Sequence, residues 1–362
     1  MSTASQLRLH LPRQLLQLPR LRHCLQTEAL LMGWLLLASA ASFAYPLASS
    51  AVTAPAAFSA AATKPGELLD AGHVDEVLRL LAPQAEGNNA TALNYLCRAY
   101  YQLQDWDSAL RNCERAAQIE PGNATFQLWL GRSYGEKANV AGPLTAFALA
   151  RKCVAAFAAA HALDRRSVAI ARDLAQYYSD APAIVGGGGD KALALAAELA
   201  SEHPADAAWV RAQVATNAGQ YAQAELQYTE AIRLDHDSAA TWLDLARFLQ
   251  GRKSWDRFQQ CVEHAIHSSR VRPSDRYDAA ELLLKTTRDL PEAAHQMRTY
   301  IQGGGTVEGA PVFRAHFLLG EILLKSGDTG RAAAEYREAI TLASSYRPAS
   351  EALRRLEAKP QP

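Results

Sequence analysis

The sequence lacks an excess of either charge. Its 362 residues carry 37 lysines and arginines against 37 aspartates and glutamates, so the formal net charge at pH 7 is zero. A protein that binds nucleic acid along its surface needs a basic face, and no stripe of basic residues interleaved with aromatic ones occurs here. We therefore expect no nucleic acid among the partners. Runs of β-branched residues are also sparse, whereas alanine and leucine abound, which favours an all-helical fold.

Residue groupings that carry catalysis or bind metals are missing as well. The sequence shows no serine, histidine and acid set, no paired carboxylates and no metal signature. Cys261, His264 and His267 recur at three-residue steps, but on a helix they would fan across about 120° of the surface, which disfavours a shared zinc ion. The glycine run 186–189 leads to Lys191 without the serine or threonine that a phosphate-binding loop requires, and so predicts a turn. The sequence therefore predicts a protein that is not an enzyme and has no cofactor.

One pattern of apolar and small residues recurs about every 34 residues. Its clearest copy is the set Leu93, Leu96, Cys97, Tyr100, Ala109, Cys113, Ala116 and Pro121. The same spacing returns in the set His316, Leu319, Gly320, Leu323, Ala332, Tyr336 and Ala339. Each copy opens with apolar residues at intervals of three and four, as on one face of a helix. Self-similarity of this kind indicates one supersecondary unit that is stacked many times.

Each unit predicts two antiparallel helices. In the copy at residues 90–123, the polar stretch 104–107 forms the turn, and Pro121 ends the second helix because proline cannot continue it. Small residues such as Cys97 and Ala116 lie where the two helices must approach closely. One such pair cannot bury its apolar faces alone, so neighbouring pairs must stack. We expect an elongated row in which each unit touches only its neighbours.

These units resemble the tetratricopeptide repeat, whose pattern is a bulky residue, leucine, a small residue and tyrosine, followed by alanine, an aromatic residue, alanine and proline. Seven copies follow one another in near-regular phase, after a degenerate unit at residues 68–81 and before a closing helix at residues 349–358. The resemblance implies an all-α fold, a right-handed α-α superhelical solenoid of stacked helix-turn-helix repeats. The array with its C-terminal capping helix is expected at residues 64–358, with a short tail at residues 359–362.

Two units depart from the regular length. Extra residues at 138–146 displace the second helix of one unit, and extra residues at 179–189 do so in the next. We expect both insertions to lengthen the turns between the paired helices.

The N-terminal segment has the pattern of a secretory signal. Four arginines precede an apolar run at residues 29–41, and small residues suited to cleavage follow. Residues 1–44 are therefore predicted to be a signal peptide, and residues 45–63, rich in alanine, serine and proline, a flexible linker. The run is shorter than the roughly 20 residues of a spanning helix, so we expect export, to a periplasmic or secreted location. The charged start is unusually long, and the alternative is a signal anchor in which residues 29–44 stay in the membrane.

Loss of the signal would change the charge balance slightly. Residues 1–44 contain four arginines and one glutamate, so their removal leaves 33 basic and 36 acidic side chains. The mature protein would be mildly acidic.

Two of the five cysteines lie on facing helices of one unit. Cys97 and Cys113 are able to form a disulfide in an oxidising compartment. The other interpretation is that both are small core residues, since free cysteine buries readily. We favour core packing.

In the tetratricopeptide family, the first helices of successive units line a concave groove, and the ninth position of each usually faces it. By this resemblance the partner-binding groove is expected to comprise Asn94, Arg98, Gln102, Arg132, Arg172, Gln176, Trp209, Gln213, Arg247, Phe317, Glu321 and Lys325. Arginine and glutamine side chains pair well with backbone carbonyls and carboxylates of an extended peptide.

The sequence thus predicts a non-catalytic scaffold that binds a protein or an extended peptide in this groove. Two alternatives stay open. One is a membrane-tethered assembly or secretion factor, and the other is an accessory domain of an enzyme that processes glycans or peptides.

Overall fold

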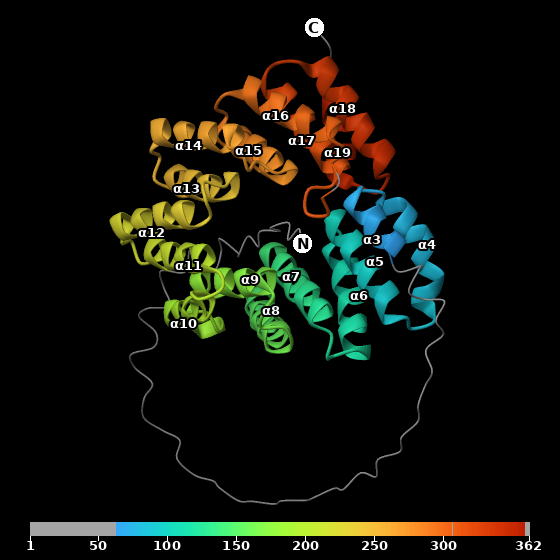
Figure 1. Ribbon diagram of the computed structural model, residues 1–362. Coiled ribbons are helices and arrows are strands. Elements are labelled where there is room, and N and C mark those ends of the chain that lie inside the picture. The colour runs from blue at the N-terminus through green and yellow to red at the C-terminus, as the bar shows by residue number, and fades with distance from the viewer. Residues whose placement is uncertain (1–62, 306, 359–362) are drawn as a thin grey trace, which may run out of the picture.

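The computed structural model describes residues 63–305 and 307–358 (Figure 1). Every regular element within these ranges is a helix, which confirms the predicted all-α fold. The predicted signal peptide, nearly all of the predicted linker, and the tail at residues 359–362 lie outside the described residues.

The helices follow one another as antiparallel pairs, one pair for each unit. The pairs are α3 (Thr63–Asp70) with α4 (Val74–Glu86), α5 (Ala90–Gln102) with α6 (Trp106–Ile119), α7 (Ala124–Val140) with α8 (Pro143–Leu163), α9 (Val168–Asp180) with α10 (Gly189–Leu199), α11 (Pro204–Asn217) with α12 (Tyr221–Leu234), α13 (Ala239–Gly251) with α14 (Trp255–His267), α15 (Pro273–Thr286) with α16 (Leu290–Gln302), and α17 (Val312–Lys325) with α18 (Thr329–Leu342). The helix α19 (Arg347–Glu357) closes the series, and the short 3-10 helix η1 (Ala183–Val185) lies between α9 and α10. The predicted solenoid of stacked helix pairs is therefore confirmed.

Polar side chains in the turns start several of these helices. The Asn89 side chain accepts a hydrogen bond from the Ala92 amide at 3.0 Å, and the Asn123 side chain caps α7 in the same way. Asp105 caps α6 through the Ser108 amide at 3.2 Å. Because these groups satisfy amides that have no partner within the helix, each polar turn fixes where the following helix begins.

A small residue of the first helix meets a large ring of the second helix in two of the units. A Cβ atom on Gly131 would lie 2.5 Å from Cδ1 of Phe157, and one on Gly320 would lie 2.5 Å from Cε1 of Tyr336. Both rings are fully buried. The small residue at this repeat position is thus required by the ring that packs over it.

Cys97 and Cys113 occupy in α5 and α6 the positions that Gly320 and Tyr336 occupy in the last unit. They form a disulfide, with their Cα atoms 5.3 Å apart, and both are fully buried. Our preference for two free core cysteines was wrong. These two positions face each other across the helix pair, so two thiols placed there come within bonding distance.

The insertion at residues 138–146 does not form a long turn, contrary to expectation. Helix α7 continues to Val140 and α8 begins at Pro143, which leaves a short connection. Proline is tolerated in the first turn of a helix, and the alanine-rich sequence that follows favours the helical state, so the extra residues lengthen the two helices instead. The other insertion, residues 179–189, does lengthen its connection, which contains η1.

Helix α8 is 21 residues long and apolar enough, by length and composition alone, to cross a membrane, and 33% of that stretch is buried. It packs against α7 in the array, where its Cys153, Phe157 and Ala160 are fully buried. The apolar side chains of α8 that face α7 are therefore part of the core between the two helices.

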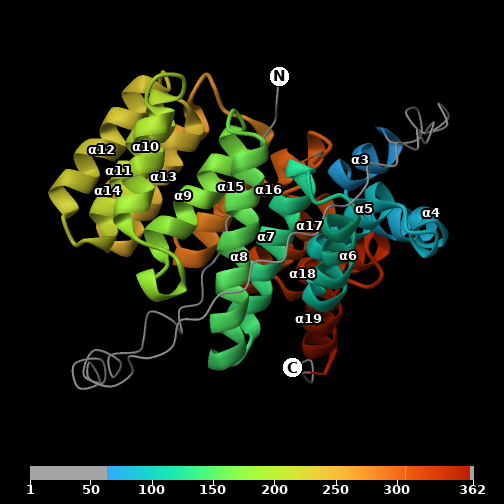
Figure 2. The same cartoon turned by 90° about the horizontal axis from the view of Figure 1, so that it is seen from below.

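The stack of pairs curves round until its first and last units meet (Figures 1 and 2). One apolar cluster contains Leu69 and Val74 from the first unit together with Phe313 and Tyr346 from the last. The Ser344 amide also donates to the Asp75 carboxylate at 2.9 Å. The expectation that each unit touches only its neighbours was therefore wrong. Each end unit leaves an apolar face uncovered, and the curvature of the array allows these two faces to bury each other.

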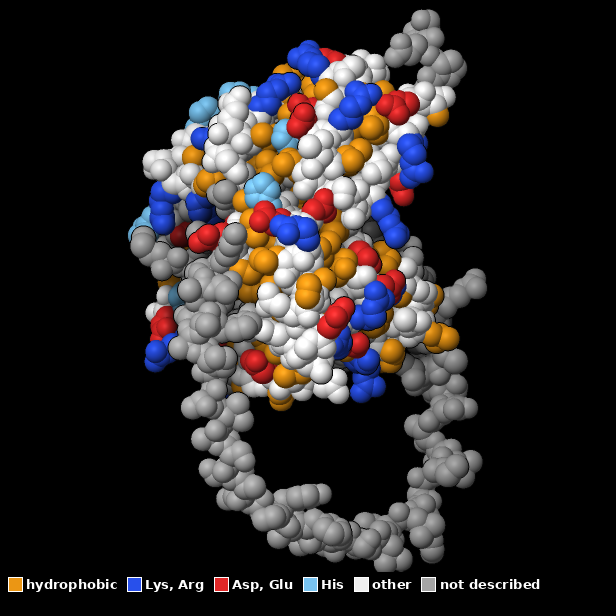
Figure 3. Space-filling view, turned by 90° about the vertical axis from the view of Figure 1, so that its right-hand side faces the viewer, with side chains coloured by type: hydrophobic (Ala, Val, Ile, Leu, Met, Phe, Trp, Pro, Cys, Tyr) orange, Lys and Arg blue, Asp and Glu red, His pale blue; other side chains and the backbone are white. Residues whose placement is uncertain are grey.

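The molecule is viewed in Figure 3 from the side on which the two ends meet. Acidic, basic and apolar side chains are interspersed over this face, and neither sign of charge dominates it.

Gly320→Ala is expected to destabilise the protein, because the new methyl group would overlap the buried Tyr336 ring. Overpacking a core typically lowers the free energy of unfolding by about 1–3 kcal/mol. Gly330→Ala is the matched control, since a Cβ at this position in α18 meets no atom within 4 Å and alanine favours a helix over glycine. Urea unfolding followed by circular dichroism measures both, and equal stability of the Gly320→Ala variant and the wild type would contradict the packing argument.

Candidate partner-binding face

In the pairs from α7 with α8 to α17 with α18, the first helix lies on the inner side of the curve and the second helix on the outer side (Figure 1). We call the surface formed by the first helices α5, α7, α9, α11, α13, α15 and α17 the inner face. All twelve residues of the predicted groove lie on these helices. The structure thus brings the predicted residues onto one face, although their side chains differ in burial and in partners.

The arginines of the predicted groove all form ion pairs with carboxylates, most of which come from other parts of the chain. The pairs are Arg98 with Glu308, Arg132 with Asp173, Arg172 with Asp206 and Asp244, and Arg247 with Asp244 and Asp278. All but Arg247–Asp244 join different units. The pairs with Asp173, Asp206 and Asp278 connect successive units, and the pairs Arg98–Glu308 and Arg172–Asp244 join parts of the chain that are further apart.

The sequence analysis did not single out these acids. Asp206 lies 34 residues after Arg172, and Asp278 lies 31 residues after Arg247, so each acid follows its arginine by about one repeat. An acid that follows an arginine by about one repeat is therefore a sequence pattern that indicates such a pair. Glu308 offers no such signal, because it lies 210 residues from Arg98.

Two glutamines continue the row between the arginines. The Gln213 amide on α11 donates to Oε1 of Gln176 on α9 at 3.0 Å. Gln176 also donates to the Asp180 carboxylate, and the Tyr228 hydroxyl donates to Gln213. The two glutamines are half-buried and joined across two units, so they are ordered in the same way as the arginines.

Aromatic rings orient the guanidinium groups. The Arg172 guanidinium lies over the Trp209 ring, 4.0 Å from its centroid. Arg98 and Arg132 both approach the Trp129 ring, at 5.4 and 4.7 Å from its centroid. Cation–π contacts of this kind restrict the rotamers of the arginines. The sequence analysis named Trp209 but missed Trp129.

Burial divides the predicted residues into two sets. Asn94, Gln102, Arg132 and Trp209 are buried. The side chains of Arg98, Arg172 and Arg247 are 15–17% exposed, so part of each side chain remains accessible.

The predicted residues of α17 have other partners. Phe317 packs against the rings of Tyr336 and Tyr346, and Glu321 accepts a hydrogen bond from the Tyr336 hydroxyl at 2.6 Å. Lys325 is exposed at the end of the helix. These three residues are thus not part of the row of arginine–carboxylate pairs.

Burial and charged partners shift the pKa values of three groups on the inner face. Burial disfavours the charged guanidinium of Arg98, but the Glu308 carboxylate outweighs it, so the pKa of Arg98 lies above its ordinary value. Two carboxylates raise the pKa of Arg172 in the same way. Burial raises the pKa of the Asp173 carboxyl, against the lowering effect of Arg132. Arg98 and Arg172 therefore remain cationic throughout the neutral range.

Arg314 near the start of α17 is a further cation that the sequence analysis missed. Its strongest electrostatic interaction is with Tyr277 on α15, which raises the pKa of Arg314, and it forms a hydrogen bond with the Tyr346 side chain. No single repeat marks this residue, because its neighbours come from three parts of the chain.

The metal and phosphate motifs that were considered in the sequence have ordinary packing roles. Within residues 63–305 and 307–358, no cluster of three or more histidine, cysteine, aspartate or glutamate side chains is placed to hold a metal ion. The His264 ring stacks on Trp242, with centroids 4.5 Å apart. A Cβ atom on Gly187 would overlap the Ala181 carbonyl, and Lys191 Nζ donates to the Gly186 carbonyl at 2.8 Å. The glycine run thus forms the predicted turn.

Arg132→Ala should destabilise the protein strongly, because it leaves the Asp173 carboxylate buried without its cation. Removing one partner of a buried ion pair typically lowers the free energy of unfolding by about 3–5 kcal/mol. Arg233→Ala is the control, since its pair with Glu230 is exposed on α12 and such pairs contribute little. Urea denaturation at pH 7 compares the two variants, and equally small effects would show that the Arg132 pair is not structural.

Two segments match the family model described as tetratricopeptide repeat, at residues 90–123 and at residues 313–346. They are the two copies in which the sequence spacing is clearest. No curated protein matches the chain.

Several solved structures are similar at low identity. A tetratricopeptide repeat protein from Parabacteroides merdae is 16% identical, with 79% of this chain and 99% of that chain covered and a TM-score of 0.37. Yeast Tom70 is 14% identical, with coverages of 84% and 61% and a TM-score of 0.47, so the chain spans less than two thirds of its length. YrrB, described as a TPR protein with an unusual peptide-binding site, is 14% identical, with coverages of 67% and 97% and a TM-score of 0.33.

The two family matches coincide with complete helix pairs, α5 with α6 and α17 with α18, and the remaining pairs repeat the same arrangement. The chain therefore contains tetratricopeptide repeats, at residues 90–123 and 313–346.

Proposed function

We propose that this protein is a non-catalytic scaffold whose inner face binds a protein or an extended peptide. One observation carries the proposal: arginines and glutamines on α5, α7, α9, α11 and α13 are held in place by side chains of neighbouring units. Tetratricopeptide repeats bind protein or peptide partners in general, and the inner face presents donors suited to the carbonyl and carboxylate oxygens of such a partner.

The binding mode follows from the ion pairs. A guanidinium has five N–H donors, and the carboxylate partners of Arg98, Arg172 and Arg247 use only some of them. The ion pairs already hold the remaining donors in place, so a partner that meets them loses little side-chain entropy in the scaffold. Recognition therefore depends on preorganised donors along several units, each of which contributes a modest part of the affinity.

Gln176→Ala together with Gln213→Ala should weaken partner binding, because both variants remove neutral donors from the inner face and leave the buried ion pairs intact. A hydrogen bond contributes about 0.5–1.5 kcal/mol, so we expect the affinity to fall at least about fivefold. The partner is first identified by capture on the full chain and mass spectrometry, and calorimetry then measures the affinity.

The matched control replaces Gln118 and Gln260, two exposed glutamines on the outer helices α6 and α14, with alanine. Circular dichroism verifies that both double variants are folded. An affinity that changes equally in the two double variants would place the partner elsewhere than on the inner face.

We also propose that the protein is exported, to a periplasmic or secreted location. The disulfide between Cys97 and Cys113 supports this, since disulfides persist in oxidising compartments and are rare in reducing ones. The signal-like composition of residues 1–44 supports it independently.

N-terminal sequencing of the mature protein tests the export proposal. Export with cleavage predicts a terminus at Ala41 or Tyr45, after one of the two sets of small residues. An intact leader recovered in the membrane fraction would instead favour the alternative, a membrane-tethered assembly or secretion factor anchored by residues 29–44.

A further inference from the structure

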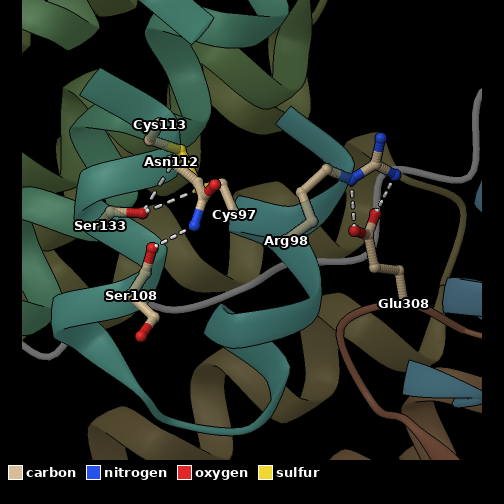
Figure 4. Close-up of a disulfide and its surroundings, with 7 residues drawn as sticks. All are labelled: Cys97, Arg98, Ser108, Asn112, Cys113, Ser133 and Glu308. Carbon is tan, nitrogen blue, oxygen red and sulfur yellow. Dashed lines mark hydrogen bonds and ion pairs between the residues drawn. A yellow bond between two sulfur atoms is a disulfide. The ribbon is translucent and has the colours of Figure 1, made fainter. Parts of the chain in front are cut away.

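The connection between α16 and α17 is held by the first two units through one residue, Glu308 (Figure 4). Arg98 Nε donates to Oε1 of Glu308 at 2.6 Å, and Arg98 Nη2 donates to Oε2 at 2.7 Å. The Gln102 side-chain amide donates to the Glu308 carbonyl at 3.0 Å. The Asp70 carboxylate accepts a hydrogen bond from the Glu308 backbone amide. The carboxylate, the carbonyl and the amide of a single glutamate are thus all bound by α3 and α5.

The contacts to Glu308 are those by which a groove binds a residue of an extended peptide. The described residues of this connection, 303–305 and 307–311, form no helix, and Glu308 reaches Arg98 from a position 210 residues away in the chain. The side chains of Arg98 and Glu308 are only 16% and 15% exposed. A bidentate arginine–carboxylate pair adds geometric specificity as well as energy, and glutamine adds a backbone contact that is independent of sequence.

The receiving side has polar atoms that Glu308 does not satisfy. Asn94 Nδ2 and Gln102 Oε1 are buried without a hydrogen-bond partner. Both side chains are only 3% exposed, and they lie on α5 four residues before and four residues after Arg98. Buried polar atoms are normally paired, so the two unpaired atoms on either side of the ion pair are hydrogen-bonding groups that Glu308 leaves unused.

We propose that Asp70, Asn94, Arg98 and Gln102 form a receptor for a glutamate in an extended peptide segment, and that Glu308 occupies this receptor as an internal ligand. The inference rests on the proposed function, because it assigns a ligand class to the N-terminal end of the inner face. A partner segment that carries a glutamate competes with Glu308 for Arg98. An internal segment acts at a high effective concentration, so it sets a threshold that a partner must exceed.

The contact of the two ends does not depend on Glu308 alone. The apolar cluster of Leu69, Val74, Phe313 and Tyr346 and the bond from Ser344 to Asp75 also join the first and last units. Replacement of Glu308 therefore removes the internal ligand and leaves the remaining contacts between the ends.

The experiment uses the full chain and a fluorescein-labelled peptide with the sequence of residues 303–311, followed by fluorescence anisotropy. We expect Glu308→Ala to bind this peptide at least about tenfold more tightly than the wild type, because the internal competitor has lost its carboxylate. Adding Arg98→Ala should abolish the gain, and so should a peptide with glutamine in place of its glutamate. Glu357→Ala, which removes a carboxylate from an exposed pair with Arg337, should behave as the wild type.

Two results would overturn the inference: equal affinity of the peptide for the wild type and Glu308→Ala, or a gain in affinity that persists when Arg98 is replaced. Glu308→Gln, which keeps the shape of the side chain, is the second host should the alanine variant be unfolded. Hydrogen exchange in the wild type needs no variant: excess peptide should accelerate exchange of the amides in residues 303–311, and unchanged exchange at saturation counts against competition.

The outcome is separable from that of the proposed function. Capture of a partner that depends on Gln176 and Gln213, without any binding of the glutamate peptide, would refute the receptor and leave the scaffold proposal standing. Binding of the peptide in a chain that captures no partner would support the receptor and count against the scaffold proposal.

Discussion

The contact between a small residue in the first helix and a large group in the second helix sets the geometry on which the whole structure depends. In two units a glycine faces a buried ring, Gly131 under Phe157 and Gly320 under Tyr336. In the unit of α5 and α6, the disulfide of Cys97 and Cys113 takes the same two positions.

The close approach at this point lets each pair act as a rigid block. Since a single pair still has uncovered apolar faces, the blocks must stack, and the small offset at each step produces the curve of the array.

The curvature of the array brings its first and last units together. The end units of an open array need polar caps, because each leaves one apolar face uncovered. Here the faces of the first and last units meet, and Leu69 and Phe313 belong to one buried cluster. The closing helix α19 still has exposed arginines, as a cap requires, but its Ala349 is buried in the same cluster. Closure thus buries both ends and brings Glu308 to Arg98.

The balance of charge in the composition has a structural counterpart on the inner face. Arginines that would otherwise repel one another alternate with carboxylates from neighbouring helices, and Asp244 is shared by Arg172 and Arg247. Pairing orders the donors and lowers the cost of burying them, because an unpaired charge in this environment is strongly unfavourable. The same pairs that hold the units together therefore prepare the surface that we propose for partner binding.

The sequence by itself determined the helix pairs and the type of repeat that they form, because the repeat spacing requires local periodicity and short turns only. It also predicted that Arg98, Arg132, Arg172 and Arg247 belong to one partner-binding groove, and that role stays a prediction. It did not indicate the disulfide as the better interpretation of Cys97 and Cys113, nor the acids that pair with the arginines.

Only the tertiary structure decided that the two ends meet and that Glu308 forms an ion pair with Arg98. Contacts over 210 residues depend on the summed curvature of every unit, and no local pattern in the sequence encodes that sum.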